Sequence, residues 1–463
     1  MPFWLIRFKN FFFLLLRNKL AAVGVFLMAL FIIMAIAAPV LTPYGPLQPV
    51  SAKYNPPTWI TLIKGPVGYS QNAHFSALTV NPQGVTVTQS NEKSYSVNLN
   101  FANSAGGTIQ IVETLSYPYQ GSPITLTGLA TIQVQSENKP FNVSAYVDRG
   151  GLARFPVWQT IQVNGTGLYS PNPLIDSRNG AFNQQLGLGG QFSAAEYIIA
   201  SKPEGYSYVL QLSIPSAFTG TIQVQDFEMN LEGNTWGIFG TDDQGYDVYT
   251  QVLYGARLSL MVGLVATSLG IGIGLLIGLM AGYLGRVVDE VLMRTADMLL
   301  VIPFLPLLIV LAATIGSSLV YIMILIGVFS WMGFARIIRS QVLSLRERPF
   351  IEAAKASGAG SGYITVRHIF PNIVSLTYVN LALTVPAAIV TEAALSFLGL
   401  SDPTVVTWGS MLGTANDVGA TVSNPAWWWI LPPGFSIALI SLAFILIGYA
   451  MDELFNPRLR RRR

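Results

Sequence analysis

Between Met298 and Ala335 the chain reads MLLVIPFLPLLIVLAATIGSSLVYIMILIGVFSWMGFA, which is 38 residues without one charged side chain. A helix needs about 20 apolar residues to cross a hydrocarbon core of about 30 Å. As a single helix this run would extend about 57 Å at about 1.5 Å per residue, far more than one crossing requires. The run therefore predicts two membrane-spanning helices joined at Gly316-Ser317-Ser318.

Four other runs are each long enough for one crossing, so the sequence predicts a polytopic α-helical membrane protein with six transmembrane helices. The predicted spans cover residues 20–40, 258–284, 298–315, 318–336, 372–392 and 430–451. The first run follows four basic residues, as the apolar region of a secretory signal peptide does. Its 21 residues exceed the usual length of about 7–15 residues for such a region, which favours an uncleaved anchor.

The charged residues divide the chain into two kinds of sequence. Hydrophobic residues make up 51% of the chain and charged residues 11%, whereas a soluble protein carries about 25% charged residues. Residues 41–257 nevertheless hold 13 of the 23 acidic residues and 9 of the 26 basic ones. This distribution predicts a soluble domain inserted into a membrane domain.

Several kinds of chemistry are excluded by residues that the sequence lacks. There is no cysteine, so disulfides and thiolate metal sites are excluded, and the two histidines, His74 and His368, lack metal-ligand spacing. No Gly-Lys dipeptide occurs, so the chain has no phosphate-binding loop of the Walker type. The sequence predicts no catalytic residue and no metal site. Because the basic residues lie beside the spans, they do not indicate a nucleic-acid partner.

The orientation of the spans follows from lysine and arginine, which concentrate in cytoplasmic loops. With the N-terminus inside, seventeen of these residues fall on the inner side, while the short outer loops, residues 316–318 and 400–428, contain none. This arrangement predicts a multi-pass protein of the cell membrane with both termini in the cytoplasm. The amphipathic segment 1–19 and the basic tail 457–463 are then cytoplasmic, and residues 41–257 are extracellular.

The predicted insertion, residues 41–240, is rich in strand-forming residues. Residues 85–88, 94–99 and 206–212 alternate or are enriched in Val, Ile, Tyr and Thr. At least seven such segments with glycine, proline or asparagine between them predict an all-β, sandwich-like domain. Asn142 and Asn164 each begin a tripeptide that N-glycosylation would accept.

Glycine recurs at every fourth position in the second predicted span. The series consists of Gly270, Gly274, Gly278 and Gly282. On a helix this spacing forms one smooth ridge that a neighbouring backbone can approach closely. The ridge predicts tight helix packing, and the alternative is a surface that slides during transport.

The loop of residues 345–371 contains the pattern Glu352-Ala353-Ala354, then Gly358, then Pro371. We expect a short helix over residues 350–357, since Gly358 and the following glycines break it. A second short helix is expected over residues 363–369, with Pro371 starting the next span. A short helix lying across the membrane face can seat in the cleft of a partner. The alternative is an ordinary loop between two helices.

This pattern resembles the "EAA" loop of permease subunits of ATP-binding-cassette importers of the type I architecture. Five further stretches occur in the order found in dipeptide/oligopeptide permeases of the "C" type. They are residues 240–247, 253–260, 281–303, 392–400 and 456–460. The resemblance covers about 1–40 and 236–463, which leaves the inserted domain outside it and assigns residues 241–456 to the permease core.

The resemblance implies a transport subunit that is not itself an enzyme. It implies a second homologous permease, two ATPase subunits and an extracellular substrate-binding protein as partners in the lipid bilayer. Glu352, Ala353, Ala354, Gly358 and Pro371 would form the surface on which an ATPase docks. ATP and Mg would bind to the ATPase subunits, so this chain is expected to bind no cofactor.

Three charged residues are further candidates for packing or coupling. Glu392 lies near the outer end of the fifth span, where an ionisable group is a functional candidate. The alternative is a solvated or paired group at the interface. Arg294 and Asp297 flank the start of the third span and are expected to form an interface pair on the inner side.

The resemblance implies ATP-driven import of dipeptides or oligopeptides by alternating access. The main alternative is the import of oligosaccharides by the same machinery, and a less favoured one is a surface-binding module that uses its spans only as an anchor. The inserted domain is expected to dock the binding protein or to gate its release of substrate, and the alternative is a passive role as a spacer or shield.

Overall fold

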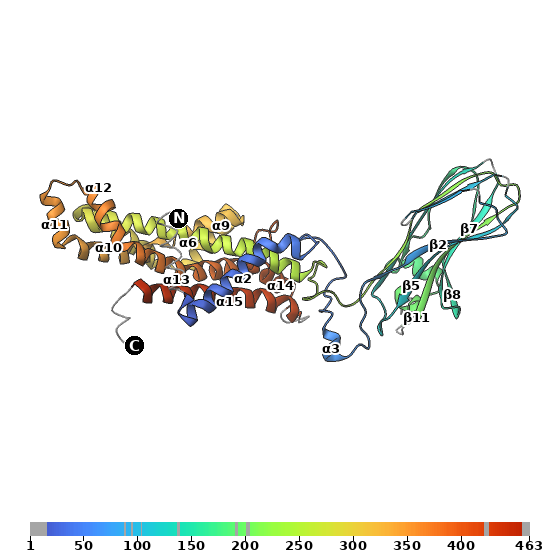
Figure 1. Cartoon of the computed structure of the whole chain (residues 1–463), viewed down its shortest axis with the longest axis horizontal. Coiled ribbons are helices and arrows are strands. Elements are labelled where there is room, and N and C mark those ends of the chain that lie inside the picture. Colours follow the sequence, from blue (N-terminus) through green and yellow to red (C-terminus); the bar gives the residue numbers. More distant parts are fainter. Residues whose placement is uncertain are drawn as a thin grey trace. The chain divides into compact units, whose positions relative to one another are not determined.

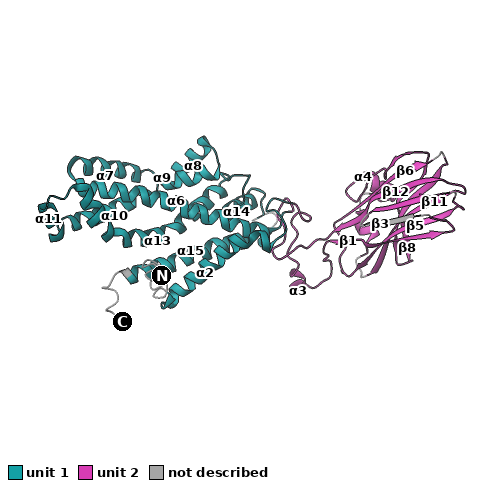
Figure 2. Ribbon diagram, turned by 45° about the horizontal axis from the view of Figure 1, so that its top comes forward, with its two compact units in different colours: residues 1–48, 246–463 teal, residues 49–245 magenta. Residues whose placement is uncertain are grey.

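The computed structural model describes residues 16–87, 89–93, 96–102, 104–136, 139–189, 193–200, 204–420 and 426–455. The chain forms two compact units, one of residues 1–48 and 246–463 and the other of residues 49–245 (Figure 2). Most of the predicted amphipathic segment 1–19 and the whole tail 457–463 lie outside the described residues.

The first unit is helical (Figure 1). Its helices are α2 (Lys19–Leu41), α6 (Val248–Leu284), α7 (Arg286–Val301), α8 (Phe304–Ile315), α9 (Leu319–Val328), α10 (Trp331–Arg346), α11 (Pro349–Ala356), α12 (Ser361–Ile364), α13 (Phe370–Phe397), α14 (Trp408–Asp417) and α15 (Trp427–Phe455), with the π-helical turn η1 (Thr365–Ile369) between α12 and α13. Among the described residues, five helical stretches are long and apolar enough to cross a membrane. A sixth is reached if α7 and α8 together count as one broken span.

The third predicted span, residues 298–315, is not one straight helix. Helix α7 ends at Val301, α8 begins at Phe304, and their axes are bent by 85°. Pro303 lacks the N–H that would continue α7, and proline also disfavours helical backbone at the preceding residue. The expected turn at residues 316–318 is present, since α8 ends at Ile315 and α9 begins at Leu319.

Two other spans extend by ten residues beyond the apolar runs that predicted them. Helix α6 begins at Val248 instead of residue 258, because Asp247 caps it: its carboxylate accepts hydrogen bonds from the Thr250 backbone N–H at 2.9 Å and from the Thr250 hydroxyl at 2.6 Å. After the junction at Phe329–Ser330, α10 continues to Arg346 instead of residue 336. Charged and polar residues can prolong a spanning helix past the hydrocarbon core, so an apolar run gives only a lower bound on its length.

The second unit consists of two antiparallel sheets with short helices. Its strands are β1 (Ala73–His74), β2 (Ser76–Gln83), β3 (Gln89–Lys93), β4 (Ser96–Phe101), β5 (Gly107–Tyr117), β6 (Thr125–Ser136), β7 (Phe141–Arg149), β8 (Ala153–Val163), β9 (Gly167–Tyr169), β10 (Ile175–Asp176), β11 (Glu204–Ile214) and β12 (Gly220–Glu232), and its helices are α3 (Ile60–Lys64), α4 (Gly180–Gln185) and α5 (Ala194–Ile198). One sheet has the order β10-β6-β12-β4-β3, with β1 on β12 and β9 on β6; the other has the order β2-β5-β11-β7-β8.

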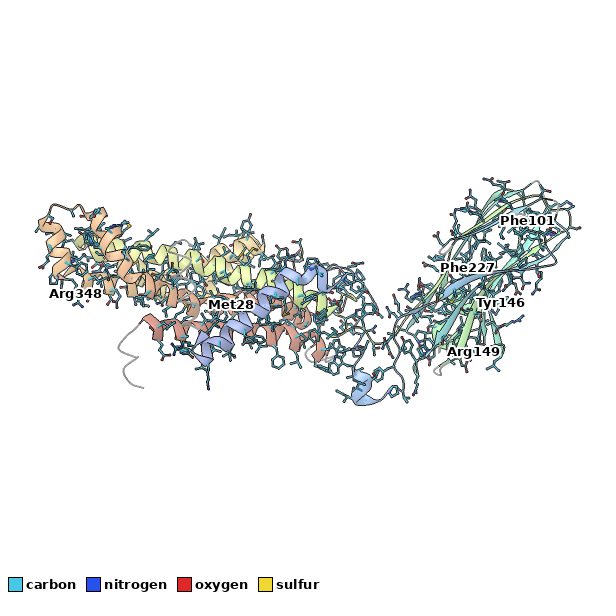
Figure 3. The ribbon with its side chains drawn as sticks, in the orientation of Figure 1. Met28, Phe101, Tyr146, Arg149, Phe227 and Arg348 are labelled. Atoms are coloured by element: carbon cyan, nitrogen blue, oxygen red, sulfur yellow. The ribbon has the colours of Figure 1, made fainter. Side chains whose placement is uncertain are left out.

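Apolar side chains from both sheets form one core, which confirms the β-rich character expected for the insertion. Tyr208 of β11 and Phe227 of β12 stack between the sheets, with ring centroids 4.4 Å apart. Phe227 and Phe101, both labelled in Figure 3, are buried in this core. Strands β4, β5 and β7 alternate between buried and more exposed residues over most of their length, as a strand with one face on a core does.

Candidate functional site

The Glu-Ala-Ala pattern lies on α11, at one end of the helical unit (Figure 1). Arg348, labelled in Figure 3, precedes the helix, and Pro349 occupies its first turn, where a missing N–H has little cost. Ile351 is buried, whereas Glu352 and Ala353 are exposed. One face of α11 is therefore fixed to the unit while the other is open.

Helix α11 ends at the glycine that the sequence indicated. Gly358 has φ +79°, a left-handed conformation that glycine adopts without strain. Its N–H donates to the Lys355 carbonyl at 2.9 Å, and the Ala359 N–H donates to the Ala354 carbonyl at 3.1 Å. These bonds satisfy carbonyls at the end of the helix and set the direction in which the chain leaves it.

The second half of the loop differs from the prediction. Helix α12, the π-helical turn η1 and α13 follow one another without a break, so residues 363–369 are not a separate short helix. Pro371 is the second residue of α13 and directly follows the π-helical turn η1. The fifth apolar helix therefore extends directly into the loop surface.

Helix α11, helix α12 and the turn η1 each have a buried side and an exposed side. Ile351, Ile364 and Ile369 pack in one cluster with Ile338 and Val342 of α10. On the exposed side, large apolar side chains are open to solvent. They are Phe350, Tyr363 and Val366, with 45%, 59% and 68% of their surface exposed. These three apolar side chains are therefore open on the surface of the loop.

The glycine ridge of α6 packs against α10 and the residues just before it. A Cβ added to Gly270 would lie 2.0 Å from Ser330 Oγ, and one added to Gly278 would lie 2.6 Å from the Ala335 carbonyl oxygen. Gly274 and Gly282 face α10 in the same way. All four predicted glycines therefore lie on one helix–helix contact, which runs toward the end of α10 that leads into α11.

Ion pairs join α7 to α10 beside this contact. Asp289 accepts two hydrogen bonds from Arg339, at 2.5 and 2.6 Å. Asp297 pairs with Arg336, whereas Arg294 pairs with Glu290 one turn away on its own helix. The expectation that Arg294 and Asp297 form an interface pair is therefore wrong. Residues three apart in this helix are held by different partners, because α10 presents its own arginines to Asp297.

Glu392 lies in α13, five residues before its end at Phe397, and only 1% of its surface is exposed. Its Oε1 accepts hydrogen bonds from the Thr407 hydroxyl at 2.8 Å and from the Ser396 hydroxyl at 3.0 Å. Thr407 is the N-cap of α14. The carboxyl group therefore connects α13 to the start of α14 and is distant in sequence from the loop on α11.

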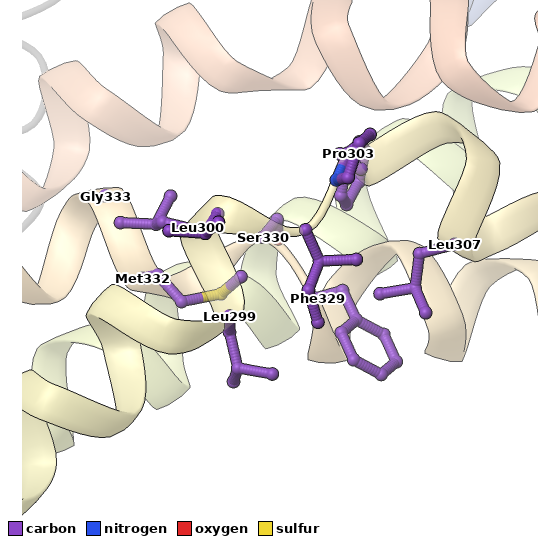
Figure 4. A pocket seen from close by; sticks show the side chains of 11 residues that line it. Leu299, Leu300, Pro303, Leu307, Phe329, Ser330, Met332 and Gly333 are labelled. Carbon is purple, nitrogen blue, oxygen red and sulfur yellow. The ribbon is translucent and has the colours of Figure 1, made fainter.

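A cavity of about 440 Å³ lies at the break between α7 and α8 (Figure 4). Residues 299–304 and Leu307 form one side, and Phe329, Ser330, Met332 and Gly333 form the other. The cavity was not predicted from the sequence, although Pro303 within an apolar run is a signal for such a break. No group of three His, Asp or Glu side chains in the described part of the chain could hold a metal ion.

These features define a polytopic helical membrane protein with a short helix, α11, exposed between two of its apolar helices. Residues 274–461 match the family described as "Binding-protein-dependent transport system inner membrane component". Residues 7–57 match "N-terminal TM domain of oligopeptide transport permease C". Between them lie residues 58–273, which include most of the β-rich unit.

Curated relatives agree with these matches. The dipeptide transport system permease protein DppC of Bacillus subtilis is 38% identical over 235 residues, which are 50% of this chain and 72% of that protein. The oligopeptide transport system permease protein OppC of Haemophilus influenzae is 34% identical over 250 residues, 53% of this chain and 78% of that protein. The chain belongs to the family of membrane permease subunits of binding-protein-dependent ATP-binding-cassette transporters.

Membership in this family makes the chain a transport subunit and not an enzyme. ATP hydrolysis belongs to partner subunits, and a substrate-binding protein delivers the transported molecule. Among solved structures, that of TmCBM61 with β-1,4-galactotriose is 13% identical, covers 38% of this chain and 99% of that chain, and has a TM-score of 0.20. That score is too low to carry an argument about the β-rich unit.

Proposed function

We propose that the chain imports dipeptides or oligopeptides together with a second, homologous permease, two ATPase subunits and an extracellular binding protein. The names of the relatives DppC and OppC support peptides over oligosaccharides. The distribution of lysine and arginine supports cytoplasmic termini and an extracellular β-rich unit. The permease core then comprises α2 and residues 246–455, and the unit of residues 49–245 is an extracellular insertion.

The observation that carries this proposal is the two-sided structure of α11. Its buried residue Ile351 joins α11 to α10, while Glu352 and Ala353 are exposed on the other side. Ala353 has a side chain small enough for close approach by a partner backbone. Glu352 lies in the first turn, where the helix dipole favours an acidic group. We infer that an ATPase cleft receives this exposed face.

A displacement of α11 has a direct route into the membrane part. Helix α10 leads into α11 and packs along the glycine ridge of α6. Arg336 and Arg339 of α10 hold α7, which ends at the cavity. We infer that α10 transmits the closure of the ATPases to α6 and α7, so that the cavity side of the unit moves during alternating access.

The test is co-purification of the complex, followed by ATPase and peptide-uptake assays in liposomes with Glu352→Ala. Loss of one charged contact with the ATPase should lower its association by about tenfold or more. Gly358→Pro should abolish association, because proline cannot adopt φ +79° and has no N–H for the Lys355 carbonyl.

Glu290→Ala is the matched control, because Glu290 is an exposed glutamate on α7 that lies outside α11 and α12. It should retain normal ATPase association. Wild-type association of Glu352→Ala and Gly358→Pro would contradict the docking surface. Uptake of an oligosaccharide instead of any peptide would contradict the proposed peptide substrate but not the docking surface.

A further inference from the structure

Two interruptions of helical backbone meet at the cavity shown in Figure 4. One is the break at Ile302–Pro303 between α7 and α8, and the other is the junction at Phe329–Ser330 between α9 and α10. Non-helical backbone at membrane depth is tolerated where it is buried in protein or lines a cavity. Transporters use such discontinuous helices to form substrate sites.

The depth of the second junction follows from the length of α9. Helix α9 has 10 residues between the turn at residues 316–318 and Phe329, which corresponds to about 15 Å of rise. That distance is about half of a hydrocarbon core of about 30 Å. With the turn at residues 316–318 at the outer membrane surface, as in the orientation proposed above, the cavity lies near the middle of the membrane, where a transported molecule has left one aqueous side and has not reached the other.

The lining of the cavity selects the chemistry of its ligand. Leu299, Leu307, Phe329 and Met332 present apolar side chains, and the Ser330 hydroxyl is already committed to the Gly327 carbonyl at 3.1 Å. At the end of α7 the Leu299 carbonyl already accepts a hydrogen bond from the Ile302 N–H at 3.3 Å. An apolar side chain therefore fits this lining.

We propose that this cavity is the mid-membrane subsite that receives one apolar side chain of a transported peptide. The inference rests on the proposed peptide-import function and names a preference within it. A volume of about 440 Å³ falls at the lower end of about 300–1,000 Å³ for small-molecule sites. It therefore accommodates a side chain and its adjoining backbone, and not a long peptide.

Gly333 offers a way to fill the cavity without disturbing the helices. It lines the cavity, and a Cβ built on it has no described atom within 4 Å. In Gly333→Leu the new side chain would project into that open space. Gly272 of α6 is the matched control, because it is also a helical glycine with no described atom within 4 Å of its Cβ and does not line the cavity.

The experiment measures uptake of Gly-Gly, Ala-Ala, Leu-Leu and Phe-Phe by the reconstituted complex. In Gly333→Leu the KM for Leu-Leu and Phe-Phe should rise about tenfold or more, since the site for a large side chain is lost. The KM for Gly-Gly and Ala-Ala should stay within about twofold, and Gly272→Leu should match the wild type. An equal rise in KM for all four peptides would overturn the subsite. Unchanged selectivity would overturn it as well, and this result is expected if a lipid acyl chain occupies the cavity.

A second measurement applies even if Gly333→Leu fails to assemble. The natural chain has no cysteine, so Gly333→Cys gives it a single thiol for maleimide labelling, with Gly272→Cys as control. Under turnover, Leu-Leu should slow the labelling of position 333 about tenfold, whereas Gly-Gly should not slow it. Equal labelling rates with both peptides would overturn the subsite. If the wild-type complex takes up no peptide, the proposed function fails at that earlier step, and the two failures remain distinguishable.

Discussion

The two units of this chain achieve close packing in opposite ways. In the helical unit, α6 meets α10 along a line of four glycines, where the absence of side chains lets the backbones approach. In the β-rich unit, large aromatic side chains, among them Tyr208, Phe218 and Phe227, are buried between the two sheets. The contact between α6 and α10 depends on the absence of side chains, whereas the contact between the two sheets depends on aromatic side chains.

The solvent of each unit explains this difference. Lipid tails are as apolar as leucine, so helices in a membrane gain little by exchanging lipid for a large side chain and associate through close backbone contact. A domain in water gains about 25 cal/mol for each Å² of apolar surface that it buries. Removing a side chain should therefore damage the β-rich unit, whereas adding one should damage the helical unit.

The largest effect is expected from removing a side chain between the two sheets. Phe218 has no exposed surface and contacts Phe101 of β4 and Phe141 of β7, with ring centroids 5.4 and 5.5 Å away. Phe218→Ala should destabilise the β-rich unit by about 3–5 kcal/mol. Hydrogen exchange of the β4 and β7 amides in the full chain measures this loss.

Leu152→Ala is the control for that substitution, because 80% of the Leu152 surface is exposed. It should change stability by less than about 0.5 kcal/mol. Similar exchange rates in Phe218→Ala and in the wild type would mean that the sheets do not depend on this aromatic contact, and the proposed contrast between the units would fail.

The next largest effect is expected from adding a side chain to the glycine ridge. In Gly278→Leu the new Cβ would lie 2.6 Å from the Ala335 carbonyl oxygen and from Ile338 Cβ. Overpacking of this kind costs about 1–3 kcal/mol, so the thermal unfolding temperature of the detergent-solubilised chain should fall. Gly272→Leu adds the same atoms where the Cβ has open space and should leave that temperature unchanged; an equal fall in both variants would contradict the role of the ridge.

How far the sequence could predict the structure also differs between the units. The four-residue spacing of Gly270 to Gly282 is a property of a single helix, so the ridge could be found without knowledge of its partner. The strand order of the β-rich unit depends on contacts between distant segments, such as β12 with β4 and β6. Alternation in single strands predicts a buried face but not the neighbour of each strand.

The candidate sites divide in a similar way. The sequence predicted the short helix of Glu352 and its end at Gly358, because both depend on local backbone preference. It did not predict that α12 continues into α13, since a proline in the first turn of a helix resembles one that ends a helix. The cavity depends on two breaks 27 residues apart in sequence, at Ile302 and Phe329, and only the fold brings them together.

The smallest effect concerns a polar exception within the core of the β-rich unit. Glu113 of β5 is buried beside Tyr208 of β11, its partner across the strands, and its Oε2 has no hydrogen-bond partner among the described residues. Burial, together with the charge of Glu228, raises the pKa of Glu113 to about 8. Burial also raises the pKa of Tyr208, so that hydroxyl stays neutral and does not offset the carboxylate.

A carboxyl group whose pKa is higher in the folded state makes the fold bind more protons than the unfolded chain. The stabilisation that protonated Glu113 contributes is fully present below the pKa of this group in the unfolded chain, about 4.5. It is lost as the pH rises toward the folded value of about 8. Between pH 6 and pH 7 the wild type should lose about 1 kcal/mol more stability than Glu113→Gln. Hydrogen exchange of the β5 and β11 amides at pH 6 and pH 7 measures this difference in stability. Glu196→Gln, at an exposed position of α5, is the control. Equal pH dependence in wild type and Glu113→Gln would show that the core tolerates the charge of Glu113.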